Sequence, residues 1–305
     1  MAATFSPVSS SSPIGVFDSG IGGLSVLQAL RHELPHERFV YLADSGNAPY
    51  GERGDAFVVP RTRDIAQHLV QHHGVKALVI ACNTATAAAV EQLRTDMPQL
   101  PLIGVEPALK PASLSSQTHH VGVMGTRGTV SSQRFARLVA EHGSRTQFHV
   151  QACDGLARAI ERSTEVPLPQ DSSTTETRAL CARYTSALGT FGVKTGQIDT
   201  LVLGCTHYIF AKDDLRALLG PEVQLVDTGA AVARQTRRML EQSGTLAPEP
   251  TDAPADLLAG PAQIQLMTTG SLSALQSSAL RWLDLPATCC TAVDIPLHAE
   301  ALASR

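Results

Sequence analysis

Short apolar runs alternate along the chain with stretches in which apolar residues recur every three or four positions. PIGVF at 13–17 predicts a strand, and LSVLQALRHEL at 24–34 predicts a helix, because its leucines fall on one helical face. RFVYLAD at 38–44 and VKALVIA at 75–81 continue the alternation as strands, and DAFVVPRTRDIAQHLVQHHG at 55–74 reads as mostly helical after Pro60. Strands separated by helices are typical of parallel sheets built from βαβ units. The pattern therefore predicts an α/β fold.

The order of elements then repeats. A strand at 121–124 leads into the Gly- and Thr-rich GTRGTV, as the first strand leads into DSGIGG, and IDTLVLG at 198–204 ends just before a cysteine, as VKALVIA does. This repetition suggests an internal duplication, although the matching pieces are short and leave that question open. The Pro- and Ala-rich residues 243–260 predict a loop or linker, and the elements after it should pack against one of the two halves.

Composition excludes several classes of protein. The chain has 305 residues, 43% of them hydrophobic, enough for one large domain or two ordinary ones. Its 24 Lys and Arg are scattered and outnumbered by 28 Asp and Glu, so no nucleic-acid partner is expected. Residues 1–12 lack the features of a signal peptide and predict a disordered tail, and no apolar run approaches the roughly 20 residues of a membrane span. We expect a cytoplasmic protein whose six cysteines are free thiols.

Two of these cysteines occupy matching positions. Cys82 in LVIACNTAT and Cys205 in VLGCTHYIF each follow a predicted strand and precede a helix. Ligands bind at the carboxyl ends of parallel strands, so both thiols should face a cleft. Because helix N-termini stabilise anions, we expect both thiolates to form more readily than the free-thiol pKa of about 8.5 implies.

A single cysteine in this context is most often a small buried hydrophobe, but two in matching positions, each followed by hydrogen-bonding residues, favour a chemical role. Metal binding lacks the spacing of further ligands, disulfide exchange usually uses near-adjacent thiols, and a Cys–His nucleophile would leave the second thiol without a role. Inversion of a carbon centre uses both, since one group removes a proton from one face while the other returns a proton to the opposite face. The pair favours a racemase.

The ordered motifs GVFDSGIGGLSVL, YLADSGNAPYG, ACNTATA, GVMGTRGTV, LVLGCTHY and VDTGAAVA resemble the cofactor-independent aspartate/glutamate racemase family over roughly residues 13–295. The resemblance implies two doubly wound parallel-sheet domains related by pseudo-symmetry, with the active site in the cleft between them. Residues 13–106 and 224–305 would form the first domain, and residues 107–223 the second. The resemblance implies no cofactor and no metal, and it implies that the protein forms a homodimer.

Residue by residue, Cys82 matches the thiol that removes the α-proton of D-glutamate, and Cys205 the thiol that acts on L-glutamate. Asp18 and His207 match the groups that assist them. The resemblance also implies a set of substrate contacts: Asp18, Ser19, Tyr50, Gly51, Asn83, Thr84, Thr126, Thr129, Thr206 and His207. The implied biological role is supply of D-glutamate for peptidoglycan.

Some matches have an equally good ordinary explanation. Thr126 and Thr129 could contact a substrate carboxylate or could cap a turn and helix. Glu161 matches an acidic position near the site but could be a solvated helix residue, and Asp44 could be a turn cap. Ile209 stands where the family commonly has proline, and residues 152–161 depart from its common CPxFVPxVE form. These departures put loop shape and regulation in doubt more than the reaction.

Three alternatives compete with this interpretation. DSGIGGLS after a strand resembles a dinucleotide-binding loop, but Ser25 stands where the third glycine should be. An amino-acid-binding module without activity would not need both thiols. Aspartate racemase is the nearest alternative within the family, and His207 after Thr206, together with the PYG motif, favours glutamate.

Overall fold

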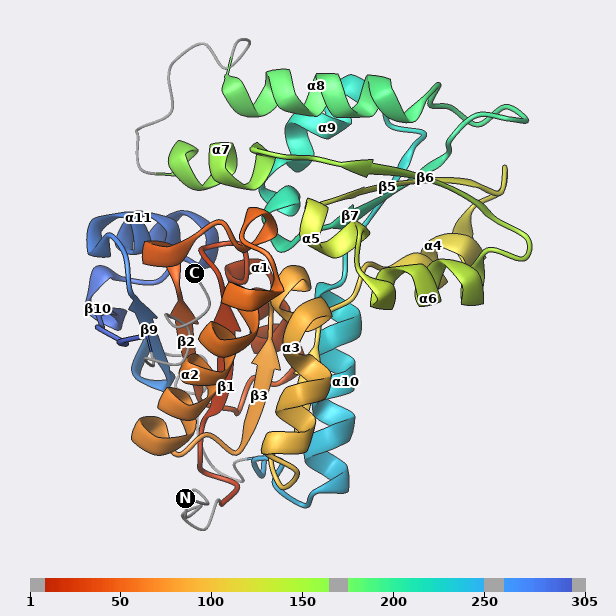
Figure 1. Cartoon of the computed structure of the whole chain (residues 1–305). Coiled ribbons are helices and arrows are strands. Elements are labelled where there is room, and N and C mark those ends of the chain that lie inside the picture. Colours follow the sequence, from red (N-terminus) through yellow and green to blue (C-terminus); the bar gives the residue numbers. More distant parts are fainter. Residues whose placement is uncertain (1–8, 165–174, 250–260, 298–305) are drawn as a thin grey trace.

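The structure is a computed structural model that describes residues 9–164, 175–249 and 261–297. Its described strands form two sheets in which every pairing is parallel (Figure 1). Sheet A has the order β10-β9-β2-β1-β3-β4, with β1 (Ile14–Asp18), β2 (Phe39–Ala43), β3 (Ala77–Ile80), β4 (Leu102–Gly104), β9 (Ile264–Thr268) and β10 (Cys290–Ala292). Sheet B has the order β6-β5-β7-β8, with β5 (His120–Gly125), β6 (Gln147–Ala152), β7 (Thr200–Gly204) and β8 (Gln224–Val226).

The two sheets repeat one topology. The first four strands of the chain lie in the order 2-1-3-4, and the next four lie in the order 6-5-7-8, which is the same arrangement shifted by four. The strands that precede Cys82 and Cys205, β3 and β7, therefore occupy equivalent places beside β1 and β5. This confirms the predicted pseudo-symmetric pair of α/β domains.

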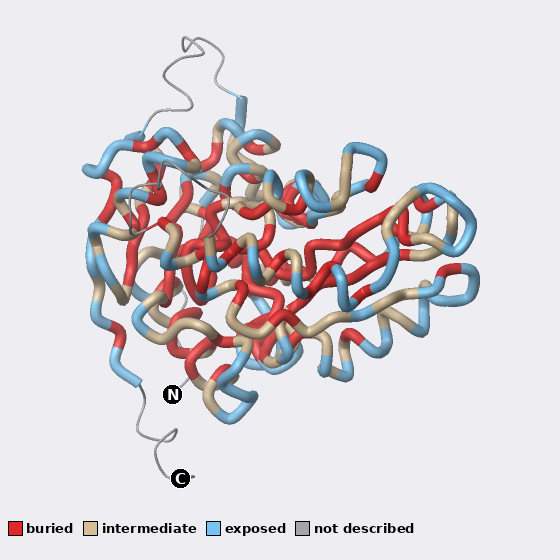
Figure 2. Tube along the Cα trace, turned by 90° about the horizontal axis from the view of Figure 1, so that it is seen from above, coloured by how far each residue is buried: buried red, intermediate tan, exposed pale blue. Residues whose placement is uncertain are grey.

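Helices cover both faces of each sheet. In the first domain these are α1 (Leu24–Glu33), α2 (Asp55–His73), α3 (Asn83–Asp96), α10 (Gly229–Gln242) and α11 (Leu272–Leu283). In the second domain they are α4 (Leu109–Ser115), α5 (Arg127–Val130), α6 (Gln133–His142), α7 (Leu156–Ser163), α8 (Glu176–Leu188), α9 (Lys212–Leu219) and the 3₁₀ helix η4 (Thr206–Ala211). Buried residues follow the strands, and exposed ones gather on the outer turns (Figure 2).

Successive side chains of a strand point to opposite faces of the sheet, and apolar side chains on both faces explain why helices cover both. Ile14 and Val16 of β1 join a core with α1, α10 and α11, while Phe17 joins the opposite core with α2 and α3. Sheet B likewise separates a core with α7, α8, α9 and η4 from a core with α4 and α6. Because strands buried on both faces read as continuous apolar runs, the sequence showed them clearly. No helix in the described part of the chain is long and apolar enough to cross a bilayer.

Several element boundaries differ from the predictions. The α2 helix already begins at Asp55 and contains Pro60 at its sixth position, where proline removes one i→i−4 hydrogen bond without ending the helix. Strand β8 pairs with β7, so the chain leaves the second sheet after residue 226 rather than before residue 224. Residues 9–12, predicted as part of a disordered tail, include a turn whose Ser10 carbonyl accepts a hydrogen bond from the buried Lys76. Residues 1–8 and 250–260 of the predicted tail and linker lie outside the described residues.

A buried ion pair between Arg61 and Asp44 connects helix α2 to the segment after β10. The Arg61 guanidinium donates two hydrogen bonds to the Asp44 carboxylate, at 2.8 and 2.6 Å, and a third to the carbonyl of Ile295 at 2.6 Å. Asp44 also accepts from the Tyr50 hydroxyl at 2.6 Å and from the Thr269 hydroxyl at 2.7 Å. This Asp44 network thereby connects α2, the loop after β2 and both segments that flank α11.

We predict that Arg61→Met lowers the free energy of unfolding by about 3–5 kcal/mol, because it leaves the Asp44 carboxylate buried without its cation. Chemical unfolding measures this. The matched control is Arg63→Met on the same helix, whose ion pair with Asp96 is partly exposed and should contribute about 1 kcal/mol or less. Equal losses in the two variants would contradict the assignment.

Candidate active site

A cavity of about 210 Å³ lies between the two domains and is lined by both thiols. Its walls come from the carboxyl ends of β1, β2, β3, β5 and β7 and from α7. The predicted residues in its lining are Ser19, Tyr50, Gly51, Cys82, Asn83, Thr84, Thr126, Glu161, Cys205, Thr206 and His207. The carboxyl ends of the strands in both sheets thus meet at one site, as the parallel topology requires.

Cys82 occupies the N-cap position of α3, directly after β3. Its Sγ lies 3.5 Å from the Ser19 hydroxyl, which in turn donates a hydrogen bond of 3.0 Å to the Asp18 carboxylate. Burial raises the pKa of the Cys82 thiol to about 12, and the nearby Asp18 charge adds to the effect. The expectation that the helix start makes this thiolate readily available is therefore wrong, because desolvation outweighs the stabilisation by helix amides. Cys82 is a thiol in this structure at neutral pH.

Asp18 lies beneath Ser19 at the end of β1 and is fully buried. One carboxylate oxygen accepts hydrogen bonds from Ser19 and the Gly20 amide, and the other accepts from the Thr206 hydroxyl of the second domain at 2.8 Å. Burial raises the pKa of Asp18 to about 6, against the opposing effects of the His207 charge and these hydrogen bonds. Asp18 is thus an ionised base at neutral pH, and its proton affinity is much higher than that of an exposed aspartate.

Cys205 has a different set of neighbours. It precedes the 3₁₀ helix η4 rather than the α-helix that was expected, and its Sγ lies 3.8 Å from Nδ1 of His207. The other ring nitrogen of His207 lies 2.5 Å from the Glu161 carboxylate. Burial lowers the pKa of His207, but its hydrogen bonds to Cys205 and Glu161 raise it well above the ordinary value. A protonated His207 can donate to the Cys205 sulfur while Glu161 balances its charge.

Glu161 is therefore an internal part of the site rather than a solvated helix residue. Its carboxylate also accepts hydrogen bonds from the Ile21 amide, at 3.2 and 3.1 Å, and from the Ser45 hydroxyl at 2.9 Å, both in the first domain. Burial alone would raise its pKa, but the His207 contact and these donors lower it. Glu161 is thus an anion that links α7 to the loops after β1 and β2.

Asn83 has both polar atoms of its side-chain amide buried without a hydrogen-bond partner among the described residues. Buried polar groups are nearly always hydrogen-bonded, so an unpartnered amide in a cavity wall indicates a polar ligand at that position. Thr84 lies beside it, and its hydroxyl is 2.9 Å from that of Thr126 across the domain boundary. This wall offers donors and acceptors but no fixed charge.

Three predicted residues lie outside the cavity lining. Asp18 is beneath it, and Thr129 lies behind Thr126, whose hydroxyl accepts the Thr129 amide as a helix cap. Asp44 is neither a cavity residue nor a side-chain cap, because its carboxylate is occupied by the ion pair with Arg61. Thr126 combines both predicted roles, since it caps α5 and lines the cavity.

The sequence interpretation missed one wall of the cavity. Ala157, Arg158 and Arg162 line it together with Glu161, and all four are on one face of α7. Their spacing of one, four and five residues was the available signal, because it places them beside Glu161 on a helix. Ser45, Ala48 and Pro49 also line the cavity, from the loop after β2.

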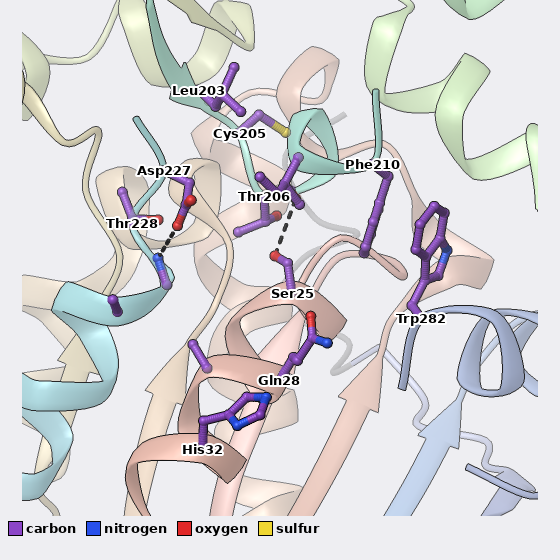
Figure 3. Close-up of a pocket in the computed structure, with 14 residues that line it drawn as sticks. Ser25, Gln28, His32, Leu203, Cys205, Thr206, Phe210, Asp227, Thr228 and Trp282 are labelled. Atoms are coloured by element: carbon purple, nitrogen blue, oxygen red, sulfur yellow. Dashed lines mark hydrogen bonds between the residues drawn. The ribbon is translucent and has the colours of Figure 1, made fainter. Parts of the chain in front are cut away.

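A second, larger cavity of about 490 Å³ lies behind Cys205 and Thr206, among α1, η4, α10 and α11 (Figure 3). Ser25 donates a hydrogen bond to the Thr206 carbonyl there, and Phe210 stacks on Trp282 with ring centroids 4.3 Å apart. The loop of Cys205 and Thr206 thus separates the two cavities. Among the described residues, no group of three or more His, Cys, Asp or Glu side chains could hold a metal ion.

Comparison with known proteins agrees with this geometry. A family profile described as Asp/Glu/hydantoin racemase matches residues 16–236. The chain belongs to this racemase family. The glutamate racemase of Ectopseudomonas mendocina is 46% identical over 245 residues, which cover 80% of this chain and 88% of that protein. That of Cupriavidus pinatubonensis is 48% identical over 237 residues, covering 77% and 82%.

Solved structures of racemases in the family share the fold. The structure of glutamate racemase isoform RacE1 from Bacillus anthracis has a TM-score of 0.77 and 30% identity, covering 94% of this chain and 98% of that one. The Escherichia coli glutamate racemase in complex with L-glutamate and the activator UDP-MurNAc-Ala has a TM-score of 0.72 and 30% identity, covering 88% and 95%. In the racemase described here, the DSGIGG amides bind Asp18 and Glu161, which argues against the dinucleotide-binding alternative.

We predict that Gly22→Ala lowers kcat by about 100-fold, because a β-carbon at this position would collide with the His207 ring and approach the Thr206 hydroxyl to 2.7 Å. His207 would have to move away from Cys205. Steady-state kinetics measure the loss, and thermal unfolding serves as the control for intact folding. A folded variant with normal kcat would contradict the proposed need for this close approach.

We also predict a pH signature of Asp18. Because its pKa is higher in the folded than in the unfolded state, its ionisation opposes folding, and stability falls as pH rises from about 4 to about 6. The contribution is on the order of 2–3 kcal/mol. Measured by urea unfolding, the free energy of unfolding of the wild type should fall by this amount between pH 4 and pH 7 relative to that of Asp18→Asn. Asp213→Asn, at an exposed position, is the control substitution. An unchanged pH dependence in Asp18→Asn would contradict the prediction.

Proposed function

We propose that this protein is a glutamate racemase that interconverts L- and D-glutamate by proton transfer between two thiols. The observation that carries the proposal is the pair itself. Cys82 and Cys205 come from different domains, line one cavity, and each has its own proton-accepting or proton-donating neighbour. Substantial identity to glutamate racemases along most of the chain supports the substrate assignment.

For D-glutamate, Cys82 removes the α-proton. Its high pKa means that the thiol must first lose a proton, and the Ser19 hydroxyl connects it to Asp18, which is ionised at neutral pH. The Cα–H bond then breaks, the proton goes to the Cys82 sulfur, and the electron pair remains on the substrate as a carbanion stabilised by its carboxylate. The Cys205 thiol delivers a proton to the opposite face, which gives L-glutamate.

For L-glutamate the roles are exchanged. Cys205 is the base, and His207, held by Glu161, supports its thiolate by donating from Nδ1. Cys82 then returns a proton to the other face. A thiol can act as base when ionised and as acid when protonated, so one pair of groups serves both directions.

The cavity walls can hold the substrate without a metal or an organic cofactor. Ser19, Asn83 and Thr84 on the first-domain side offer hydroxyl and amide groups to a carboxylate, and Thr126 and Thr206 offer hydroxyls from the second domain. Tyr50 and Gly51 form the wall between them. Preorganised donors of this kind stabilise the charge that develops in the transition state. Asp18, Thr129 and Asp44 support this lining from behind.

The proposal has a biological part as well. D-glutamate supply for peptidoglycan, a cytoplasmic location and assembly as a homodimer follow from the family resemblance. An activator is named for the Escherichia coli relative. Aspartate is the second candidate substrate, because a smaller dicarboxylate would also find these donors.

We predict that Cys82→Ser and Cys205→Ser each lower racemisation in both directions by at least about 100-fold, since a hydroxyl is a far weaker acid than a thiol and almost none of it is deprotonated to act as a base at neutral pH. The assay follows optical rotation and α-deuterium incorporation by NMR in deuterated water, with D- and L-glutamate as separate substrates. Each variant should still exchange the α-proton of the enantiomer that its remaining thiol faces. Cys205→Ser should exchange only D-glutamate, and Cys82→Ser only L-glutamate.

Cys181→Ser is the matched control, because this buried thiol is outside the cavity lining and should leave both rates unchanged. Full activity of either active-site variant would refute the two-thiol mechanism. Racemisation of aspartate but not glutamate by the wild type would keep the mechanism and overturn the substrate.

A further inference from the structure

Two arginines of α7 stand on the cavity side of the helix. Arg158 and Arg162 both line the 210 Å³ cavity and are exposed at its rim. They are four residues apart, so they are neighbours on the helix surface and repel each other. Neither arginine takes part in the proposed proton transfer.

Their partners differ. Arg162 forms an ion pair with Glu176 at 2.6 Å, in which both side chains are more than half exposed. Arg158 finds no hydrogen-bond or ion-pair partner among the described residues, although the other charged side chains of the lining are paired. Counting only partners in the described part of the chain, helix α7 therefore presents one uncompensated cation, Arg158, to the mouth of the cavity.

The remaining charges make this cation important. Inside the cavity, the charges of protonated His207 and ionised Glu161 cancel, and Asp18 beneath the floor adds a negative charge. The whole chain carries a net charge of −4. A dicarboxylic amino acid is itself a net anion, so without a rim cation it would approach an anionic protein and an anionic floor.

We propose that Arg158 is a specificity-determining residue that draws net-anionic amino acids into the cavity through long-range electrostatic attraction. This inference rests on the proposed function and names the feature of the site that favours a dicarboxylate over neutral amino acids. A charge at the mouth of a low-dielectric cleft raises the local concentration and the association rate of a charged substrate, and salt weakens the effect. Its exposure gives Arg158 the reach to meet the substrate before the thiols do.

The test compares Arg158→Ala, Arg158→Lys and Arg158→Glu with Arg238→Ala. Arg238 is an exposed arginine of α10 outside the cavity lining, so its removal changes the net charge equally. Two quantities are measured at about 20 mM and about 300 mM NaCl: kcat/KM for glutamate, and the dissociation constant of glutarate by calorimetry. Glutarate is a dianion without the α-amino group, and its binding needs no turnover.

At low salt we expect Arg158→Ala to lower kcat/KM about 5- to 10-fold through KM, with kcat within about two-fold of the wild type. Glutarate binding should weaken by a similar factor. Arg158→Lys should keep most of the wild-type value, Arg158→Glu should fall below the alanine variant, and the difference between wild type and Arg158→Ala should shrink at high salt.

Several results would overturn the inference. One is that Arg158→Ala and Arg238→Ala behave equally at low salt, and another is that Arg158→Lys is as impaired as Arg158→Ala. A loss confined to kcat, or a wild type that does not bind glutarate, would also contradict it. Failure of the proposed function is a separate outcome. A wild type that binds glutarate in an Arg158-dependent way but racemises no amino acid would support the role of Arg158 in binding and refute the proposed racemase activity.

Discussion

The buried carboxylate of Asp18 is the interaction on which the rest of the site depends. It lies at the end of β1 and accepts hydrogen bonds from the Gly20 amide of the loop that follows and from the Thr206 hydroxyl of the second domain. Because Thr206 follows Cys205 directly, this bond sets the position of the second thiol relative to the first domain, while Ser19 connects the same carboxylate to Cys82. One acidic group thereby fixes the geometry of both thiols and the relation of the two domains. Because this central position is fully buried, the pKa of Asp18 is raised.

Pseudo-symmetry of the fold does not extend to the assisting groups. The strands before Cys82 and Cys205 are equivalent, yet Cys82 connects through a serine to a carboxylate, whereas Cys205 lies beside an imidazole supported by a carboxylate. Burial and the nearby Asp18 carboxylate raise the pKa of the Cys82 thiol, whereas the imidazole beside Cys205 has its own pKa raised by its hydrogen bonds to Cys205 and Glu161. In the proposed mechanism the two thiols therefore have chemically different assisting groups.

How far the sequence could predict this arrangement depended on the kind of interaction. Strands such as β1 and β3 were visible because burial on both faces makes them continuously apolar, and the two cysteines were visible because each follows such a strand. The partnership of Glu161 with His207 joins residues 46 positions apart and was not predicted; the family resemblance indicated only that Glu161 lies near the site. The Asp44–Arg61 pair carried no local signal, since its hydrogen-bond partners come from segments as distant as Thr269 and Ile295. The pKa of Cys82 was predicted in the wrong direction because desolvation depends on packing that no sequence motif records.

The residues proposed for proton transfer and those at the mouth of the cavity come from different kinds of structural element. Ser19, Asn83 and the thiols lie at strand ends, where the parallel topology fixes their positions, and in the proposed mechanism they bind the substrate and move its α-proton. Helix α7 lies in one of the two segments where this sequence departs from the common family pattern, and it carries both Glu161, which contacts His207, and Arg158, which lines the mouth. Two residues on adjacent turns of one helix thus have different proposed roles, since Glu161 holds His207 and Arg158 attracts the substrate. Differences among relatives in substrate capture are accordingly expected along α7, where a side chain can change without moving either thiol.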